Sequence, residues 1–506
     1  MERDEGEYAY CGQLVLQLIP PFKAAYTLKL PGTCFVYSLI MLFGGQTIAA
    51  IHLGLLIVNC LSIIFLFLIV KRLLNPEAAL IACLSFAFLS LSPTVLGFAA
   101  HATHFIILPA LAGTFLLLFC LENGRLSLYW ASGFLFGLAF LMKQQGIFFI
   151  FFGFCVILQA GLSSRPVRMK KVVKCLLAFG AGAAIPFMAV LALAWLSGSF
   201  DKFWFWTFKY AAKYVRIYAP SKAFEVFQES FLTVTKGFEF LWFTGALGLI
   251  VLWLDKRLKN IRWFIGILTI CSFLAVCPGF YFRFHYFIVF LPALAILIAI
   301  VINYLQFFLS REYSNKYLQY VPLLILLSGI AIGINMYKDY FFFKKPEVLA
   351  KEIYGNNPLI ESIKIAEYLH ANTKPDETIA VVGSEPEIYF YSQRKSATGY
   401  IYTYGLMENQ DYRQAMQQEM IAEIEHSRPK YLIFIKISTS WLEDPEAERL
   451  IFNWFDTYSQ RNYQLAGVVD IISTGNTRYI WGDAARTHKI ESESYIQVFE
   501  RRGVSR

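Results

Sequence analysis

The chain has 506 residues, of which 57% are hydrophobic and only 16% charged, and its mean hydropathy of +0.50 is too high for a soluble globular protein. The net charge of +9 is uneven, because residues 1–337 carry 25 Lys and Arg against 12 Asp and Glu, whereas residues 338–506 carry 20 against 24. Most cations of the first part lie in short segments between apolar runs. They therefore indicate membrane topology and argue against nucleic acid as a partner.

The chain begins with a dense acidic cluster, Arg3-Asp-Glu-Gly-Glu-Tyr8. The first seven residues lack the basic and then apolar pattern of a cleavable signal peptide. Crowding of like charges can raise one carboxyl pKa into the range that suits proton transfer, which makes the cluster a candidate catalytic motif. An acidic, solvated terminus is the alternative.

Ten apolar runs follow, and each approaches the roughly 20 residues that a helix needs to cross a bilayer. They are predicted near residues 47–70, 77–97, 104–121, 126–142, 147–161, 173–196, 238–254, 262–280, 287–309 and 320–337. Ten spans place both ends of the chain on the same side of the membrane. We therefore expect a transmembrane domain over residues 47–337.

Alternate loops between these runs are basic. They contain Lys71 and Arg72, then Arg125, then Arg165 to Lys174, then Lys256 to Lys259, and finally Arg311 and Lys316. By the positive-inside rule these loops face the cytoplasm. The first loop, residues 1–46, the loop 197–237 and everything after residue 337 then face outward. This is the topology of a multi-pass protein of the plasma (inner) membrane with an extracytoplasmic C-terminal part.

An aromatic and cationic segment, Phe203-Trp-Phe-Trp-Thr-Phe-Lys-Tyr-Ala-Ala-Lys-Tyr214, lies in the outward loop 197–237. Its composition predicts a helix that lies along the membrane surface. It can serve as a lid over a site or as an ordinary interfacial anchor.

The pattern changes after residue 337. Short apolar runs at 378–383 and 430–435 predict strands, and helical patterns near 359–371, 411–427 and 443–461 separate them. Strand-like runs near 464–472, 477–482 and 494–500 can add antiparallel edges. Residues 338–506 therefore predict a small extracytoplasmic α/β domain. The turn Gly383-Ser-Glu-Pro386 follows a strand as a phosphate loop would, but an ordinary strand-to-helix turn is favoured because it lacks the glycine pattern.

Three cations on the outward side break the topology rule: Lys29, Lys143 and Arg283. Something anionic must hold them there, either a phosphate group or lipid headgroups reached by snorkelling side chains.

Two histidines, His101 and His104, flank another outward loop and can hydrogen-bond a sugar or a phosphate, or be interfacial residues without a catalytic role. Their spacing would also allow metal binding, but the sequence assigns no third ligand, so no metal site is predicted and a divalent metal is not excluded. All nine cysteines lie at or before Cys277 without CxxC spacing, which argues against disulfides and structural zinc.

These motifs resemble those of a known family. The opening Arg3 to Tyr10, the Lys29-Leu-Pro-Gly32 segment, a Tyr37 before a Phe-Gly pair and Arg283-Phe-His-Tyr286 are similar to outer-face motifs of family 39-type glycosyltransferases with the GT-C fold. That family includes protein O-mannosyltransferases and the aminoarabinose transferase that modifies lipid A. The resemblance extends over the membrane half, and an outward soluble domain also fits it.

The resemblance implies a polytopic α-helical fold and specific roles. Asp4 would be the catalytic carboxylate with Glu5 beside it, and Lys29 would contact the phosphate of a polyprenyl-phosphate sugar. Arg283, His285 and Tyr286 would belong to the basic-His-Tyr pattern of the substrate site, to which we add Lys143, His101 and His104. Family members have a span that precedes the first loop, so we expect one upstream of Met1.

The expected function is therefore transfer of a sugar, by one inverting displacement, from the lipid donor to a hydroxyl or amine of a protein, glycolipid or polysaccharide. A transporter or flippase for an anionic lipid-linked substrate is the main rival. Its charges should lie near the bilayer midplane, often within inverted repeats, whereas these cluster at the outer ends of spans. A receptor or scaffold is a third interpretation, but it leaves the acidic loop and the outer cations unexplained.

Overall fold

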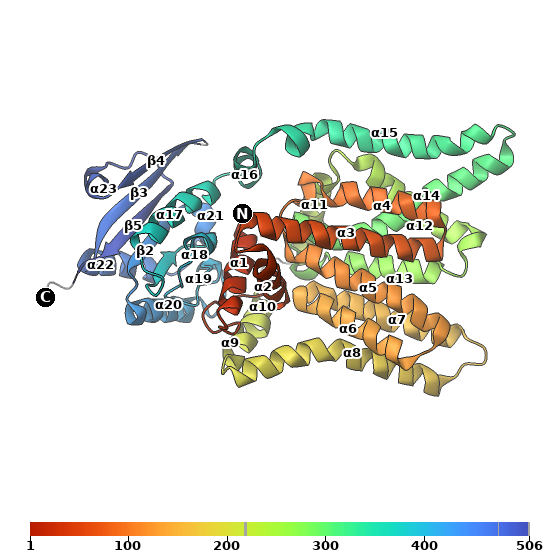
Figure 1. Ribbon diagram of the computed structural model, residues 1–506, viewed down its shortest axis with the longest axis horizontal. Coiled ribbons are helices and arrows are strands. Elements are labelled where there is room, and N and C mark those ends of the chain that lie inside the picture. The colour runs from red at the N-terminus through yellow and green to blue at the C-terminus, as the bar shows by residue number, and fades with distance from the viewer. Residues whose placement is uncertain (217–219, 474, 504–506) are drawn as a thin grey trace.

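The computed structural model describes residues 1–216, 220–473 and 475–503. Long helices run side by side over most of its length, and a sheet domain lies at one end (Figure 1). The chain starts between these two parts, with α1 (Arg3–Leu16) and α2 (Gly32–Gly44). Residues 1–46, expected as a loop, therefore contain two helices.

Each of the ten predicted spans coincides with a helix. These are α3 (Ile48–Leu73), α4 (Pro76–Ser90), α5 (Ala102–Asn123), α6 (Leu126–Met142), α7 (Ile147–Ser163), α8 (Met169–Leu196), α12 (Glu239–Leu254), α13 (Arg262–Leu274), α14 (Leu291–Glu312) and α15 (Val321–Met336). Six of the described helical segments are long and apolar enough to cross a membrane, and a seventh span is added if α11 (Ala223–Thr235) and α12, bent by 117°, count as one. Helices α4, α6 and α13 are shorter, so the count of ten spans stays a prediction.

Local signals set several helix ends. The side chain of Thr47 accepts a hydrogen bond from the Ala50 N–H at the start of α3, and Asn75 does the same for Ala78 before α4. Helix α5 ends at Gly124, whose φ of 64° suits glycine. Large apolar side chains remain exposed along these helices, as a lipid-facing surface requires, whereas α14 is buried along most of its length.

Small residues allow the membrane helices to approach closely. A Cβ added at Gly133 of α6 would lie 2.0 Å from the Phe179 carbonyl oxygen of α8, and one added at Gly182 of α8 would lie 2.0 Å from the Trp130 carbonyl oxygen. The backbones of α6 and α8 are thus in close contact at these glycines. This packing through small residues is a frequent way for helices to associate in a bilayer.

The sheet domain contains one five-stranded sheet of order β1-β2-β5-β3-β4. The strands are β1 (Ile379–Val382), β2 (Tyr431–Lys436), β3 (Tyr463–Ser473), β4 (Asn476–Trp481) and β5 (Tyr495–Arg501). Strands β1 and β2 are parallel and the other pairs are antiparallel. The last three strands were expected as added edges. Of these three, only β4 is an edge strand, because β5 and β3 lie inside the sheet.

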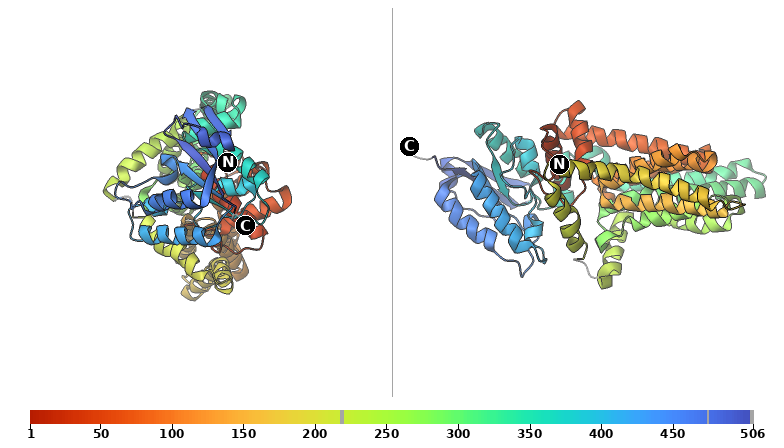
Figure 2. Two further views of the ribbon diagram at one scale, coloured as in Figure 1. Left: turned by 90° about the vertical axis from the view of Figure 1, so that its left-hand side faces the viewer. Right: turned by 90° about the horizontal axis from the view of Figure 1, so that it is seen from below.

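Helices surround the sheet. They are α16 (Pro346–Tyr354), α17 (Leu359–Asn372), α18 (Glu387–Ser392), α19 (Tyr404–Met407), α20 (Arg413–Ser427), α21 (Ser438–Trp441), α22 (Leu450–Asn462) and α23 (Asp483–Thr487). The helix expected over 443–461 thus begins later, at Leu450. Seen from below, the sheet domain is a separate lobe that α1 and the segment after α8 join to the long helices (Figure 2).

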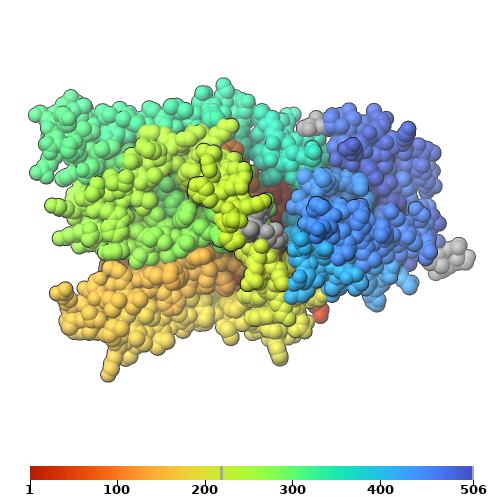
Figure 3. Space-filling model, turned by 180° about the vertical axis from the view of Figure 1, so that it is seen from behind, coloured from red at the N-terminus to blue at the C-terminus, as the bar shows by residue number. Residues whose placement is uncertain are grey.

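The aromatic segment after α8 is helical, as predicted. It consists of α9 (Phe200–Trp204), a π-helix (Phe205–Tyr210) and α10 (Ala211–Tyr214). Figure 3 shows it between the long helices and the sheet domain. Phe203, Trp206 and Tyr210 are buried, so part of its aromatic surface is covered by protein instead of lying against the bilayer.

Candidate active site

Helix α1 is held against the sheet domain by its first residues. Arg3 donates to the Glu385 carboxylate over 2.7 Å and to the Thr439 carbonyl over 2.8 Å, and it also contacts the Tyr404 hydroxyl. A Cβ added at Gly6 would lie 2.8 Å from the backbone nitrogen of Glu387, so only glycine allows this approach to α18. The turn Gly383 to Pro386 is thus a strand-to-helix turn, as favoured from its sequence, and it binds Arg3.

One lysine bridges two carboxylates of α1. Lys29 Nζ donates to Asp4 Oδ1 over 2.9 Å and to Glu7 Oε2 over 2.6 Å. The Thr27 hydroxyl also donates to Glu7, and the Tyr402 hydroxyl donates to Asp4 Oδ1 over 3.2 Å. Asp4 keeps 24% of its side chain exposed, whereas Glu7 keeps 5%. Asp4 is therefore the more accessible carboxylate of the pair.

The loop that carries Lys29 is tied to the loop that carries Lys143. Gln144 Nε2 donates to the Leu28 carbonyl over 2.7 Å, and the Thr33 hydroxyl donates to the Met142 carbonyl over 2.9 Å. These bonds bring two of the three predicted outer cations together. Lys143 is buried, with its ammonium group 4.1 Å from the centre of the Tyr286 ring.

Arg283 is the third predicted cation and is exposed. Its guanidinium group stacks 5.4 Å from the centre of the Tyr281 ring, and its charge contributes to the low pKa of Lys143. Arg283 therefore lies at the outer edge of the same cluster.

Two histidine rings stack beside Asp4. The His101 and His285 ring centres are 4.1 Å apart with an angle of 11° between the planes, and His101 Nδ1 lies 3.9 Å from Asp4 Oδ2. Neither ring nitrogen of His101 forms a hydrogen bond within the described part of the chain. One ligand atom from each of Asp4, His101 and His285 lies within 4.8 Å of the others, a nitrogen and oxygen set that suits a divalent cation. Of the two histidines that the sequence considered for metal binding, only His101 belongs to this group, whereas His104 is fully buried on α5 outside it.

Glu5 is placed differently from Asp4. Its Oε1 accepts hydrogen bonds from the Ala100 N–H over 2.7 Å and from His52 over 2.9 Å, and its Oε2 accepts from the Glu2 N–H over 2.8 Å. The bond to Glu2 is half of a capping box that starts α1. Burial opposes ionisation of Glu5, but the hydrogen bonds from His52 and from the Ala100 N–H outweigh it and hold its pKa at about 2. Glu5 therefore fixes the start of the helix, and hydrogen bonds within the protein occupy both of its carboxylate oxygens.

Electrostatics in the cluster follow from burial and neighbouring charge. Burial opposes ionisation of Asp4, but Lys29, His101 and Lys143 outweigh it and hold its pKa well below the usual range. Burial and then the charge of Lys29 lower the pKa of Lys143 to about 7. Burial lowers the pKa of His101 to about 4 despite the nearby Asp4. At neutral pH the site thus holds an ionised Asp4, a neutral His101 and a lysine whose pKa lies near neutrality.

Sequence reasoning missed the sheet-domain residues. Tyr402 follows Asp4 by 398 positions, and Glu385 follows Arg3 by 382 positions. No local pattern marks Tyr402, and the turn that contains Glu385 gave no sign that it binds Arg3. For Glu7 and Thr27 a signal existed, because Glu7 is part of the acidic cluster and Thr27 lies two residues before Lys29.

The aromatic segment docks on the sheet domain. Tyr210 donates to Glu408 over 2.5 Å, Lys213 pairs with Asp411 over 2.5 Å, and Lys202 pairs with Glu419. The Phe205 ring lies 5.0 Å from that of Tyr412.

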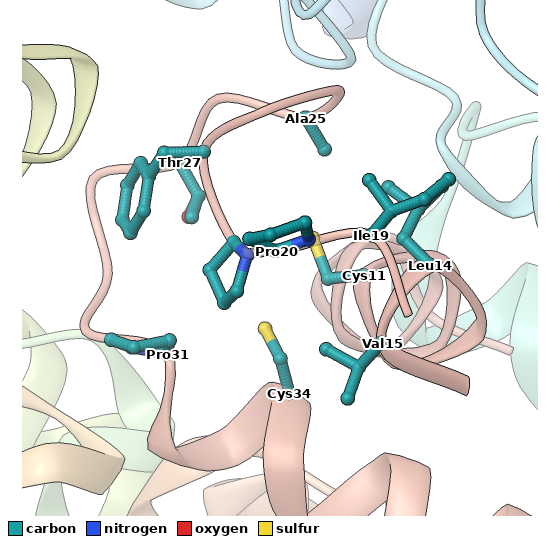
Figure 4. Close-up of a pocket in the computed structure, with 11 residues that line it drawn as sticks. Cys11, Leu14, Val15, Ile19, Pro20, Ala25, Thr27, Pro31 and Cys34 are labelled. Carbon is teal, nitrogen blue, oxygen red and sulfur yellow. The ribbon is translucent and has the colours of Figure 1, made fainter. Parts of the chain in front are cut away.

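A small pocket lies farther along the same face of α1, beyond Glu7 (Figure 4). It is narrow and mainly apolar. Its lining residues are Cys11, Leu14, Val15, Ile19, Pro20, Pro21, Phe22, Ala25, Thr27, Pro31 and Cys34. Thr27 connects the pocket to the site through its hydrogen bond to Glu7.

Comparison with known sequences gives one family. Residues 29–195 match the family model described as dolichyl-phosphate-mannose-protein mannosyltransferase. A search among curated proteins gave no significant match.

Comparison with solved structures gives the fold. ArnT from Cupriavidus metallidurans, bound to undecaprenyl phosphate, is similar with a TM-score of 0.58 and 13% identity over 98% of this chain and 93% of that one. The archaeal oligosaccharyltransferase AglB from Archaeoglobus fulgidus, in complex with an inhibitory peptide and a dolichol-phosphate, has a TM-score of 0.52 and 12% identity over 96% of this chain and 71% of that one. Both are glycosyltransferases with the GT-C fold. The resemblance expected from the sequence is thus confirmed at the level of the fold: the chain is a membrane protein with the GT-C glycosyltransferase fold, and its residues 29–195 are similar to the dolichyl-phosphate-mannose-protein mannosyltransferase family.

Proposed function

We propose that this protein transfers a sugar from a polyprenyl-phosphate donor to an acceptor hydroxyl or amine at the outer membrane face. One observation carries the proposal: the partly exposed Asp4 carboxylate is bonded to Lys29, with Lys143 and Arg283 nearby, where the membrane helices meet the sheet domain. A lipid phosphate cannot leave the bilayer, so its headgroup must meet fixed cations at such a boundary. The known ligands of the two similar proteins, undecaprenyl phosphate and dolichol-phosphate, agree with a donor of this class.

The arrangement of basic loops supports the outward orientation of the site. The sheet domain and α1 lie at one end of the long helices (Figure 1). Arg72 pairs with Glu122, and a Cβ added at Gly124 would meet the Lys171 ammonium group at 3.0 Å. Three of the basic loops therefore lie together, at the end of the long helices opposite to the sheet domain (Figure 1). That end faces the cytoplasm by the positive-inside rule, which leaves the sheet domain outside.

The reaction needs a base for the acceptor and positively charged groups around the phosphate of the donor. Asp4 would take the proton of the acceptor as it attacks the anomeric carbon, and the bond to the phosphate would break on the opposite face, with inversion. Lys29, Lys143 and Arg283 would stabilise the charge that develops on the departing phosphate. His101 and His285 lie beside Asp4, Tyr286 lies under Lys143, and these three residues would position the donor.

Binding of the donor would also prepare the base. Lys29 lowers the pKa of Asp4, and a carboxylate that is stabilised in this way is a weak base. A phosphate that draws Lys29 toward itself would remove this stabilisation. Asp4 would then become basic only when the donor is present.

A divalent cation is compatible with the same residues. Asp4, His101 and His285 would hold it, and when bound it would supply further positive charge for the phosphate.

Asp4→Asn tests the proposal. The amide retains the shape of the side chain but cannot accept a proton, so transfer should fall by at least about 100-fold, as is typical when general-base catalysis is lost. The measurement is transfer from dolichyl- or undecaprenyl-phosphate-linked sugars by the purified protein in liposomes. Glu225→Gln, which changes an exposed outer acid on α11, is the matched control. Near-normal transfer by Asp4→Asn, with loss in Glu225→Gln, would move the base to the later loop.

A further inference from the structure

A pair of cysteines faces the apolar pocket beside the site. Cys11 lies on α1 and Cys34 on α2, with 8% and 5% of their surfaces exposed. Figure 4 shows both sulfur atoms pointing into the pocket from facing elements. The other seven cysteines, from Cys60 to Cys277, lie in or next to the membrane helices.

The backbones of α1 and α2 touch at this level. A Cβ added at Gly12, the residue after Cys11, would lie 3.1 Å from the Ser38 nitrogen and 3.2 Å from the Tyr37 Cβ. Ser38 is one helical turn after Cys34. A disulfide requires such a close approach, with Cα atoms roughly 4.4–6.8 Å apart.

We propose that Cys11 and Cys34 form a disulfide in the mature protein. The oxidant would be the disulfide of a thiol oxidoreductase. One cysteine thiolate attacks that disulfide to give a mixed disulfide, and the second thiolate displaces the oxidoreductase as a dithiol. The cysteine pair loses two electrons and two protons, and the oxidoreductase gains them. The proposal relies on the outward orientation proposed above, because disulfides persist outside the reducing cytoplasm.

The bond must form before α1 is fully packed. A hydrogen bond with Cys34, together with burial, raises the pKa of the Cys11 thiol, and a protonated, buried thiol reacts slowly. Once formed, the bond closes the segment between Cys11 and Cys34, which contains Thr27 and Lys29. Both residues bind the carboxylates of α1, so the covalent link restricts the loop that places Lys29.

Differential alkylation of the full chain tests this proposal without reference to turnover. Cells that express the protein are quenched in acid, and the denatured protein is alkylated with a light reagent, reduced and alkylated with a heavy reagent. Trypsin cuts after Lys23 and Lys29 and so separates the two cysteines. We expect Cys11 and Cys34 to carry the heavy label, the other seven to carry the light label, and unreduced samples to contain the linked peptide.

Two variants, one that removes a cysteine of the pair and one that removes a different cysteine, test whether the protection depends on the pair. Cys34→Ser should release Cys11 to the light reagent, whereas Cys60→Ser should leave the pair protected. Light labelling of both Cys11 and Cys34 in the wild-type protein would overturn the proposal, as would a linkage of either to another cysteine. Loss of transfer in Asp4→Asn alongside free thiols would retain the proposed function and reject the disulfide alone.

Discussion

The hydroxyl of Tyr402 donates a hydrogen bond to Asp4 Oδ1 over 3.2 Å, across 398 positions of the sequence. Burial and the charge of Asp4 raise the pKa of Tyr402 well above its usual range, so the phenol stays protonated and remains a donor. The sheet domain thus contacts the proposed base directly.

Tyr402→Phe should make Asp4 harder to ionise. A hydrogen bond to a carboxylate stabilises its charged form, so its loss should raise the apparent pKa of the base by about one unit. The acidic limb of the kcat/KM profile should move to higher pH by that amount. Tyr458→Phe, in the same domain but away from the site, is the control. An unchanged acidic limb would show that Tyr402 does not act on the base.

Lys29→Ala and Arg283→Ala should weaken donor binding. Each removes a charge-assisted contact worth about 1.5 to 3 kcal/mol, which is a loss of roughly 10- to 100-fold in affinity. Binding of a polyprenyl-phosphate sugar to the purified variants measures this effect. Lys236→Ala, an exposed lysine of the outer loop, should bind normally. Wild-type affinity in both variants would remove these residues from the site.

Donor affinity should depend on pH through Lys143. Its pKa of about 7 means that it loses its charge as the pH rises from 6 to 8. An anionic donor prefers the charged amine, so affinity should be constant below pH 6 and should fall, by at most about tenfold per unit, above pH 7. A sugar phosphodiester is the suitable probe, because its own charge does not change in this range. Lys143→Arg stays charged and should flatten the profile, and an equally steep fall in that variant would contradict the assignment.

Chelation should leave transfer largely intact, because three cations already face the proposed phosphate position. The measurement is turnover in liposomes after dialysis against EDTA. Loss of turnover, with recovery on addition of Zn²⁺ or Mn²⁺, would contradict this expectation. Such a result would assign Asp4, His101 and His285 to a metal ion.

Periodicity and charge predicted much of the fold. Apolar runs marked each of the ten long helices from α3 to α8 and from α12 to α15, because a helix surface that faces lipid or the bundle interior needs an almost continuous apolar sequence. The five strands were also marked, but their order was not, because β5 pairs with β2 across 58 residues of intervening chain. Helix α1 was missed because Gly6 and Gly12 lower its helix propensity. The structure uses both glycines for close packing.

Part of the site was also predicted from the distribution of charge along the sequence. Lys29 and Lys143 violate the topology rule, and that violation is visible in the sequence. Glu5 and Asp4 are neighbours in sequence and equally acidic, yet helix geometry turns Glu5 toward Ala100 and His52 and leaves Asp4 beside Lys29. Only three-dimensional placement distinguishes them.

The tight contact between Gly6 and α18 also limits how this protein can be engineered. The helix that bears Asp4 is fitted to the sheet domain at backbone distance and through Arg3 and Glu385. A chimera that exchanges the C-terminal part between relatives must therefore exchange residues 1–16 with it. A junction placed only after α15 would combine the α1 helix of one protein, which bears Asp4, with the sheet domain of another. The contact surfaces of the two parts would then not match.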